Sequence, residues 1–332
     1  MDKVLVTFQG YGGVQRHRIH DPFQHIHKNG LANIQHTPSL DNLDDDSIKA
    51  LEAFDVVVFN RNISGVFNPQ EVYSSLRKAG VKIIIDLDDF WELPKSHVAY
   101  PLYQKTNLTA AMLWQIRNAD MVWVTHERLG RAVSEYNRNW YVIPNGIDPD
   151  TFPAEDNEYT RTVFYQGSVT HRTDLELIKD MDITVCGDVY GDEEWAKIRK
   201  MMTNATFEDA KTADKYHELY YDKGICVIPL KQNKFNQMKS NLKMIEAGWY
   251  KKPVVVAGIH PYVPFARHKE NAMVVKRGKY DANLKELQAS KTLQDDIRLQ
   301  LHEDILEHHM MEDINRKRVE LIAAVKNEMR IL

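Results

Sequence analysis

Short runs of β-branched and other apolar residues alternate along most of this chain with segments that have the periodicity of amphipathic helices. This alternation predicts strands joined by helical crossovers, and such strands pair in parallel. The expected fold class is therefore α/β. The runs that predict strands are Lys3–Phe8, Asp55–Phe59, Lys82–Asp86, Met121–Thr125, Trp140–Ile143, Thr162–Gln166, Ile183–Cys186, Ile225–Pro229, Pro253–Ala257 and Ala272–Val275.

The alternation is interrupted once, by the segment Pro144–Thr160, which is rich in Pro, Asp and Asn. Such residues favour turns over regular structure, so we place a domain linker there. The expected domains are residues 1–150 and 151–300, each Rossmann-like. Residues 301–332 end in INRKRVELIAAVKNEMRIL, which predicts an amphipathic helix that packs back across the first domain.

Composition sets limits on compartment and partners. The 332 residues carry a formal net charge of −4, which gives no global footprint for nucleic acid or anionic membrane but leaves a local basic groove possible. The apolar run at the N-terminus is too short for a signal peptide, and no stretch approaches the roughly 20 apolar residues that span a bilayer. We therefore expect a cytoplasmic protein without an integral membrane segment. The sequence does not indicate an oligomeric state.

The most specific motif is LKQNKFNQMKSNLKMIEAGWYKKPVVVAG, where Lys239, Lys243 and Glu246 share one face of an expected helix. Asn236 is expected to cap that helix, so that Lys239 and Ser240 lie in a first turn whose N–H groups face phosphate oxygens. Glu246 is placed to accept hydrogen bonds from sugar hydroxyls. The alternative is an exposed helix that alternates Lys and Glu for solubility.

A second small-residue loop, GSVTHRTDLELI, follows the expected strand Thr162–Gln166. Gly167 and Ser168 are placed to cradle a diphosphate, and His171 and Arg172 to donate hydrogen bonds to it. The loop alone is common in α/β proteins. The loop indicates a ligand site only in combination with the Lys239 segment. Both follow strands of one domain, and such sheets bind ligands at the carboxyl ends of their strands.

The first strand leads into QGYGGVQRHRIHDP, where Gly10, Gly12 and Gly13 allow a ligand to approach the backbone closely. The order of these glycines departs from the dinucleotide fingerprint. Arg16 and Arg18 follow and are candidate anion ligands. The alternative is a tight turn with solvated arginines.

Three carboxylates, Asp86, Asp88 and Asp89, lie at the end of the expected strand Lys82–Asp86. Carboxylates at this edge suit a divalent cation, a base for an acceptor hydroxyl, or a hydrogen-bonded turn. We favour Asp88 as the carboxylate that faces the ligand. The spacing of the histidines matches no zinc signature, and we expect no metal site.

Together these segments resemble the GT-B superfamily of nucleotide-sugar glycosyltransferases, of the family 4-like type, with a bacteriophage type as an alternative. The resemblance covers almost the whole chain. It implies two Rossmann-like domains that face each other across a cleft, with the donor, a UDP- or GDP-sugar, on the second domain. It assigns the diphosphate to Gly167, Ser168 and Arg172, with Lys239, Ser240 and Lys243 around it, and the ribose to Glu246. It also implies that no cofactor is obligatory.

The chain departs from that family at two points. Members with an E-x7-E motif have a glutamate eight positions before the second one, and Met238 stands there. Many members also place a histidine after the fourth strand, where this chain has Asp86, Asp88 and Asp89. An aspartate there suits a general base for inversion. The catalytic residues expected are thus Asp88, Arg172 and Lys239.

The acceptor is less constrained. A glycan or lipid-linked sugar hydroxyl is the first expectation, and Asp89 is assigned to the acceptor side. The alternative is a phage enzyme that glycosylates a hydroxymethylated pyrimidine in DNA, with Arg16, Arg18 and Arg61 as phosphate contacts. Two further alternatives are a non-catalytic two-domain binding protein and a nucleotide-sugar epimerase.

Overall fold

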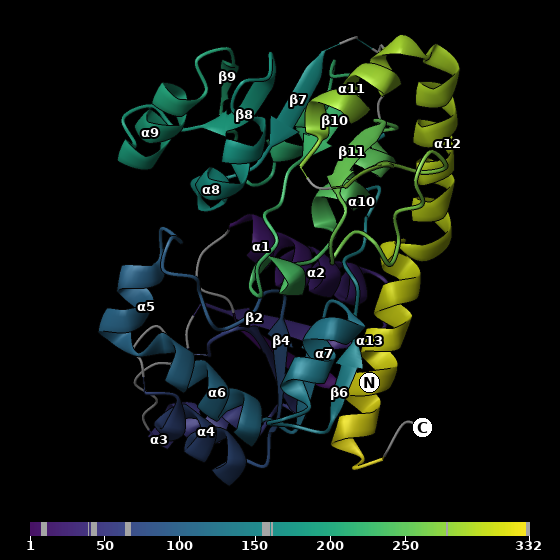
Figure 1. Ribbon diagram of the computed structural model, residues 1–332. Coiled ribbons are helices and arrows are strands. Elements are labelled where there is room, and N and C mark those ends of the chain that lie inside the picture. The colour runs from purple at the N-terminus through teal and green to yellow at the C-terminus, as the bar shows by residue number, and fades with distance from the viewer. Residues whose placement is uncertain are drawn as a thin grey trace. The chain divides into compact units, whose positions relative to one another are not determined.

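The structure is a computed structural model that describes residues 1–7, 12–38, 40, 45–63, 68–154, 160, 162–276 and 278–329. The chain divides into two compact units. Unit 1 comprises Met1–Leu93, Pro101–Asp148 and Met311–Leu332, and unit 2 comprises Pro94–Tyr100 and Pro149–Met310. Each unit holds a six-stranded parallel sheet with helices around it (Figure 1), which confirms the predicted α/β class.

The sheet of unit 1 has the strand order β2-β1-β3-β4-β5-β6. Its strands are β1 (Lys3–Thr7), β2 (Asn33–Thr37), β3 (Val56–Asn60), β4 (Lys82–Leu87), β5 (Met121–Val124) and β6 (Trp140–Val142). β3 is buried along its whole length, as expected for a parallel strand that helices cover on both faces. β2 is the strand that the sequence analysis missed here, because this edge strand reads NIQHT and lacks an apolar run.

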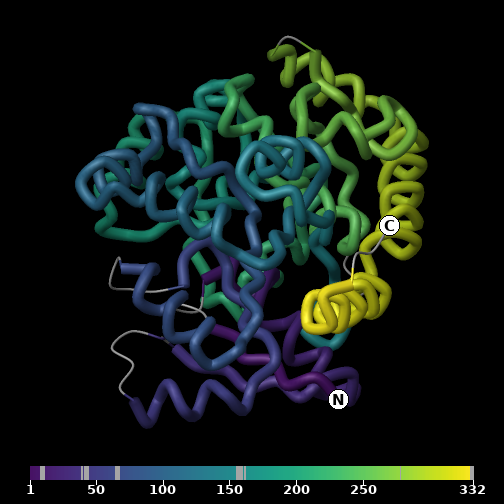
Figure 2. Tube along the Cα trace, turned by 90° about the horizontal axis from the view of Figure 1, so that it is seen from below, coloured from purple at the N-terminus to yellow at the C-terminus, as the bar shows by residue number. Residues whose placement is uncertain are grey.

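The helices of unit 1 include the last helix of the chain. They are α1 (Gly13–Gln15), the π-helix η1 (Arg16–His20), α2 (Asp21–Lys28), α3 (Asp45–Leu51), α4 (Pro69–Lys78), α5 (Tyr100–Thr106), α6 (Leu108–Asn118), α7 (Glu127–Val133) and α13 (Met311–Lys326). Ile314, Leu321 and Ile322 of α13 share one apolar core with Val4 and Phe23. In Figure 2, α13 lies beside the N-terminal segment. The C-terminal helix therefore returns to the first unit, as predicted.

The sheet of unit 2 has the order β12-β11-β10-β7-β8-β9. Its strands are β7 (Val163–Gln166), β8 (Thr184–Asp188), β9 (Thr206–Asp209), β10 (Ile225–Ile228), β11 (Val254–Ala257) and β12 (Met273–Val275). β7 lies in the middle, the next two strands extend to one side of it, and the last three extend to the other. This is the Rossmann order, and its direction reverses between β7 and β10.

The helices of unit 2 are mostly short, and the longer ones lie toward the C-terminus. They are α8 (Arg172–Leu175), α9 (Glu193–Met201), α10 (Leu242–Trp249), α11 (Tyr280–Ala289), α12 (Lys291–His308) and the 3-10 segments η2 (Val169–His171), η3 (Glu176–Ile178), η4 (Tyr216–Tyr220) and η5 (Asn236–Met238). A Cβ on Gly248 of α10 would lie 2.7 Å from Leu301 and 2.8 Å from Ile305, both on α12. The glycine thus permits close packing of these two helices.

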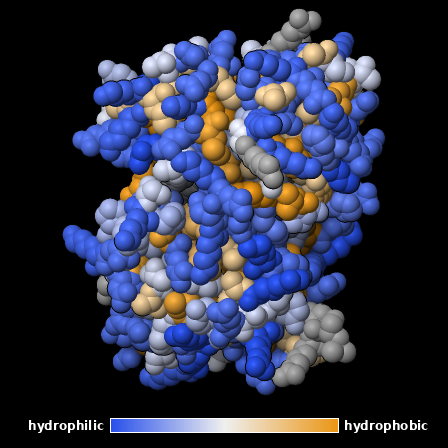
Figure 3. Space-filling model, viewed as in Figure 1, coloured by the Kyte–Doolittle hydropathy of each residue, from blue (hydrophilic) through white to orange (hydrophobic). Residues whose placement is uncertain are grey.

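Hydrophilic residues cover most of the face drawn in Figure 3, as expected for a chain whose apolar runs are buried in its two sheets. Among the described helices, none combines the length and the apolar character that a membrane span requires.

Candidate functional site

Two segments of unit 2 meet where the sheet order reverses. His171 ends η2, which follows β7, and Lys243 lies in α10, which follows β10. Lys243 Nζ is 3.2 Å from His171 Nε2. Because the carboxyl ends of β7 and β10 flank the switch point, this contact lies where Rossmann sheets bind ligands. The two motifs that the sequence analysis paired are therefore brought together.

His171 connects Lys243 to a buried carboxylate. His171 Nδ1 lies 2.9 Å from Asp174 Oδ2. The other oxygen of Asp174 accepts hydrogen bonds from the Lys231 backbone N–H and from Asn236 Nδ2, both at 2.8 Å. Because a carboxylate accepts at Nδ1, that nitrogen carries the imidazole proton and Nε2 accepts from Lys243. Asp174 thereby fixes the ring, and the ring fixes the lysine.

The charges of this cluster favour a neutral imidazole. Burial lowers the pKa of His171, the positive charges of Lys243 and Lys239 lower it further, and the pKa falls to about 3 despite the hydrogen bond to Asp174. Burial raises the pKa of Asp174, but the bond from His171 and the Lys231 N–H lower it more, so it is ionised at neutral pH. With His171 uncharged, Lys239, Lys243 and Asp174 carry a net charge of about +1.

The expected helix start is wrong. Asn236 does not cap the helix but begins η5, and its side chain binds Asp174. α10 begins at Leu242 with Asn241 as its N-cap. Lys239 and Ser240 therefore precede the helix instead of lying in its first turn, because the bonds of Asn236 tie this stretch to the β7 loop.

Lys239 nevertheless belongs to the cluster. Its Nζ lies 4.5 Å from the centre of the Phe235 ring, a cation–π distance. Its positive charge lowers the pKa of both His171 and Asp174.

Glu246 is buried on α10, and each of its carboxylate oxygens accepts from a tyrosine hydroxyl. Tyr216 donates to Oε1, and Tyr220 donates to Oε2 at 2.7 Å. Both tyrosines lie on η4, which precedes β10. No sequence pattern links them to Glu246. The carboxylate is thus held rigidly at the position that the resemblance assigns to the ribose.

The loop after β7 is shaped by its own packing. A Cβ on Gly167 would lie 2.1 Å from the Tyr165 hydroxyl, so a larger residue does not fit without a shift. The Ser168 hydroxyl is 2.7 Å from that of Thr170. Arg172 forms an ion pair with Glu194 of α9, with Nε and Oε2 at 2.9 Å. Its guanidinium is therefore already next to one carboxylate.

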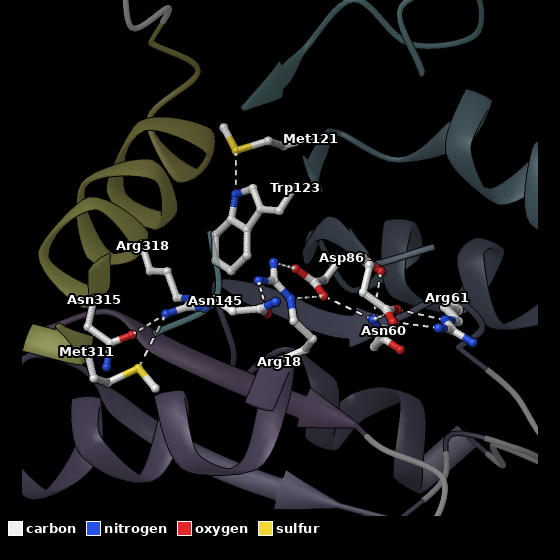
Figure 4. A network of polar contacts seen from close by, with 11 residues as sticks. Arg18, Asn60, Arg61, Asp86, Met121, Trp123, Asn145, Met311, Asn315 and Arg318 are labelled. Carbon is white, nitrogen blue, oxygen red and sulfur yellow. Dashed lines mark hydrogen bonds and ion pairs between the residues drawn. The ribbon is translucent and has the colours of Figure 1, made fainter. Parts of the chain in front are cut away.

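Unit 1 has its own polar cluster at the carboxyl ends of its strands (Figure 4). Arg18, which is 1% exposed, binds Asp86 through two bonds: Nε to Oδ2 at 3.0 Å and Nη2 to Oδ1 at 2.5 Å. Its Nη1 donates to Asn145 Oδ1 at 3.0 Å. Asn60 donates to Asp86 and to Asp88. The alternative in which Arg18 is solvated in a turn is wrong, because Arg18 is buried and its pair with Asp86 compensates the burial of both charges.

Arg61 adopts a left-handed backbone conformation, with φ of 60°, and its side chain binds two carboxylates. Its Nε donates to Asp88 Oδ1 at 2.7 Å, and Nη2 binds Asp88 Oδ2 and Asp89 Oδ2. Burial raises the pKa of Asp88, but the charge and hydrogen bonds of Arg61 lower it more. Asp88 is thus ionised at neutral pH and weakly basic.

The other predicted site residues of unit 1 lie between β1 and Arg18 in the sequence. Arg16 is 3% exposed, and its Nε donates to Asp21 at 2.9 Å, so it too is buried and paired. Gly12 precedes α1, and a Cβ on Gly12 or Gly13 would meet no described atom within 4 Å. Gly10 lies outside the described residues.

The sequence analysis missed several polar residues of these clusters, namely Asn60, Asn145, Tyr216, Tyr220 and Arg318, the last of which interacts electrostatically with Arg18 and Asp86. One of them had a visible pattern: Arg318 occupies a position of the apolar stripe of α13, between Ile314 and Leu321. Within the described ranges, no three His, Cys, Asp or Glu side chains gather in an arrangement that suits a metal ion.

No protein-family model matches the sequence, and no curated protein sequence matches it. Solved structures do match, over nearly the whole chain. Sucrose-phosphate synthase from Thermosynechococcus elongatus has a TM-score of 0.75 at 12% identity and covers 99% of this chain and 100% of its own. HepE from Anabaena, in complex with UDP and glucose, has a TM-score of 0.69 at 13% identity and covers 98% of this chain and 100% of its own. An alpha-glucosyltransferase, AGT, in complex with UDP, has a TM-score of 0.67 at 12% identity and covers 97% of this chain and 100% of its own.

These matches confirm the predicted GT-B fold. At such identities the likeness concerns the fold, and residue roles must come from the clusters described above.

Proposed function

We propose that the protein transfers a sugar from a nucleotide diphosphate-sugar to a hydroxyl acceptor, with the donor on unit 2. The observation that carries this is the pair of lysines at the β7/β10 switch point, one of them held by a neutral His171. When the bond to the anomeric carbon breaks, negative charge builds on the departing diphosphate. Cations that are already in place stabilise that charge.

Each residue then has a role. Lys243 and Lys239 stabilise the leaving diphosphate, and the Gly167–Ser168 loop lies beside its oxygens. Arg172, adjacent on α8, adds positive charge once the ligand competes with Glu194. His171 acts as a neutral acceptor that orients Lys243, which revises its expected role as a donor to the diphosphate. Glu246 binds the ribose. These cations stabilise the negative charge of the diphosphate, as a bound metal ion does in other transferases.

For the donor we propose a UDP-hexose. HepE has been solved with UDP-glucose, and AGT with UDP. GDP-sugars have the same diphosphate and are the alternative to test.

For the acceptor we propose a hydroxyl of a glycan or lipid-linked sugar, with Asp88 as its base. A base must be ionised, and Asp88 is, although Arg61 makes it weak. Nothing in the described clusters favours DNA as the acceptor, since Arg16 and Arg18, two of the expected phosphate contacts, are buried and bound to carboxylates.

Calorimetric titration with UDP, GDP, UDP-glucose and GDP-mannose tests the donor site. The double variant Lys239→Met/Lys243→Met is expected to weaken binding of the preferred nucleotide by about 100-fold or more, from charge-assisted bonds of about 1.5–3 kcal/mol each. Lys285→Met, which removes a lysine that is 71% exposed, is the control and is expected to bind as the wild type does. Asp88→Asn is expected to bind the donor normally but to lose turnover.

Absence of binding to every nucleotide in the panel, or unchanged binding by the double variant, would refute the donor site. Donor binding without nucleotide release in the presence of a broad acceptor mixture would favour a binding protein instead.

A further inference from the structure

Arg318 is the least satisfied charged side chain in the described part of unit 1. It is 0% exposed, and only its Nη1 has partners, Asn315 Oδ1 at 2.7 Å and the weak acceptor Met311 Sδ at 3.7 Å. Its Nε and Nη2 are buried and have no hydrogen-bond partner among the residues that the structure describes. Three N–H donors of one guanidinium are thus unsatisfied, which native proteins avoid.

The positive charge of Arg318 also lacks a carboxylate of its own. The carboxylate whose charge acts on it, Asp86, already binds Arg18 with both of its oxygens. Burial lowers the pKa of Arg318, the charge of Arg18 lowers it further and Asp86 raises it, and the result, about 9, keeps the guanidinium protonated at neutral pH. Two buried guanidinium groups therefore share one carboxylate, and a buried unpaired charge is strongly destabilising.

The unsatisfied atoms form a specific geometry. Nε and Nη2 are one edge of the guanidinium, and this is the edge with which Arg18 binds both oxygens of Asp86. That fork matches two oxygens of a phosphate or carboxylate. A water molecule would satisfy donors but would leave the charge in place.

The position of Arg318 also points to a ligand. Its neighbours Arg18, Asp86 and Asn145 follow β1, end β4 and follow β6, at the carboxyl edge of the sheet. Figure 4 shows Arg318 reaching this group from α13 while Arg18 reaches it from the segment after β1. Ligands of open α/β sheets bind at this edge.

We propose that unit 1 binds a small oxyanion, a phosphate group, on the Nε–Nη2 edge of Arg318. The anion neutralises the charge that Arg18 and Arg318 share. Its source is either free inorganic phosphate or the phosphate of a phosphorylated sugar, and the chemistry that recognises it is the same. The site is distinct from the lysine cluster of unit 2 and does not depend on the proposed transfer reaction.

Thermal unfolding of the full chain with increasing phosphate, at constant ionic strength, tests this proposal. The melting temperature of the wild type is expected to rise with phosphate by mass action. Arg318→Met, which fills similar volume without charge, is expected to lose that rise and to melt at least as high as the wild type without phosphate. Arg316→Met on the same helix removes an arginine that is 61% exposed and is expected to keep the rise.

Glucose 6-phosphate, compared with glucose and with inorganic phosphate, separates the two sources. A larger rise with the sugar phosphate identifies a phosphorylated ligand, and an equal rise identifies the free anion. A wild type indifferent to phosphate, or an Arg318→Met variant that responds like Arg316→Met, would overturn the proposal. If Arg318→Met does not fold, calorimetry on Arg318→Lys decides: at least tenfold weaker phosphate binding supports the site, and equal binding refutes it.

Discussion

The polar edges of the two sheets use charge in opposite ways. In unit 1, Asp86 is bound by Arg18, and Asp88 and Asp89 are bound by Arg61, so the predicted site residues neutralise one another. In unit 2, Lys243 is held by a neutral imidazole, and the carboxylate behind it, Asp174, binds the ring and not the lysine. Apart from Arg318, the charged residues of the unit 1 cluster thus pair with one another, whereas in unit 2 a neutral ring separates Lys243 from the carboxylate of Asp174.

The largest effect is expected from breaking the fully buried Arg18–Asp86 pair of unit 1, the inner pair. Asp86→Asn leaves Arg18 and Arg318 buried without the carboxylate that they share, which should lower the free energy of unfolding by about 3–5 kcal/mol. Urea denaturation followed by tryptophan fluorescence measures it. Asp89→Asn, at a carboxylate that is 20% exposed, is the control and should cost about 1 kcal/mol or less. Equal losses in the two variants would show that the buried charges do not hold unit 1 together.

A smaller effect is expected from the pH dependence of unit 2. The pKa of His171 is about 3 in the folded protein against 6.5 when unfolded, so between these values the unfolded state binds the proton and the folded state does not. Stability due to this group is therefore complete above pH 6.5 and falls as the pH is lowered toward 3. The loss by pH 4 should be on the order of 3 kcal/mol.

Urea denaturation between pH 7 and pH 4 measures this slope. His171→Asn should flatten it, since asparagine does not titrate, whereas His308→Asn, at a residue that is 53% exposed, should keep the slope of the wild type. A wild-type slope in the His171 variant would mean that the imidazole is not held neutral, and the contrast between the two units would fail.

The smallest effect is expected at the more exposed Arg61–Asp88 pair of unit 1, the outer pair. Arg61→Lys keeps the charge but loses the two-pronged bond to Asp88, and the side chain is 29% exposed, so the loss should be about 1 kcal/mol. The same urea titration measures it. A loss as large as that of Asp86→Asn would indicate that the outer pair supports the fold as much as the inner one does.

Much of the fold could be predicted from local pattern. Ten strands were found because parallel strands that are covered on both faces need continuous apolar runs, as in the VVVFN of β3. β2 and β9 were missed because these edge strands, NIQHT and TFED, are partly exposed and carry polar residues. The start of α10 was misplaced because Asn236 bonds to Asp174, 62 residues away in sequence, instead of capping a helix.

The candidate site, like the fold, could be predicted in part from the sequence. Sequence by itself determined which residues follow the carboxyl ends of the strands, and so brought His171, Lys243, Asp86 and Asp88 into consideration. Only the tertiary structure decided their partners: that His171 is neutral between Asp174 and Lys243, that Glu246 is held by two tyrosines, and that Arg318 is buried beside Arg18. The reason is physical. Backbone periodicity is local, whereas the charge state of a side chain depends on burial and on neighbours that are distant in the chain.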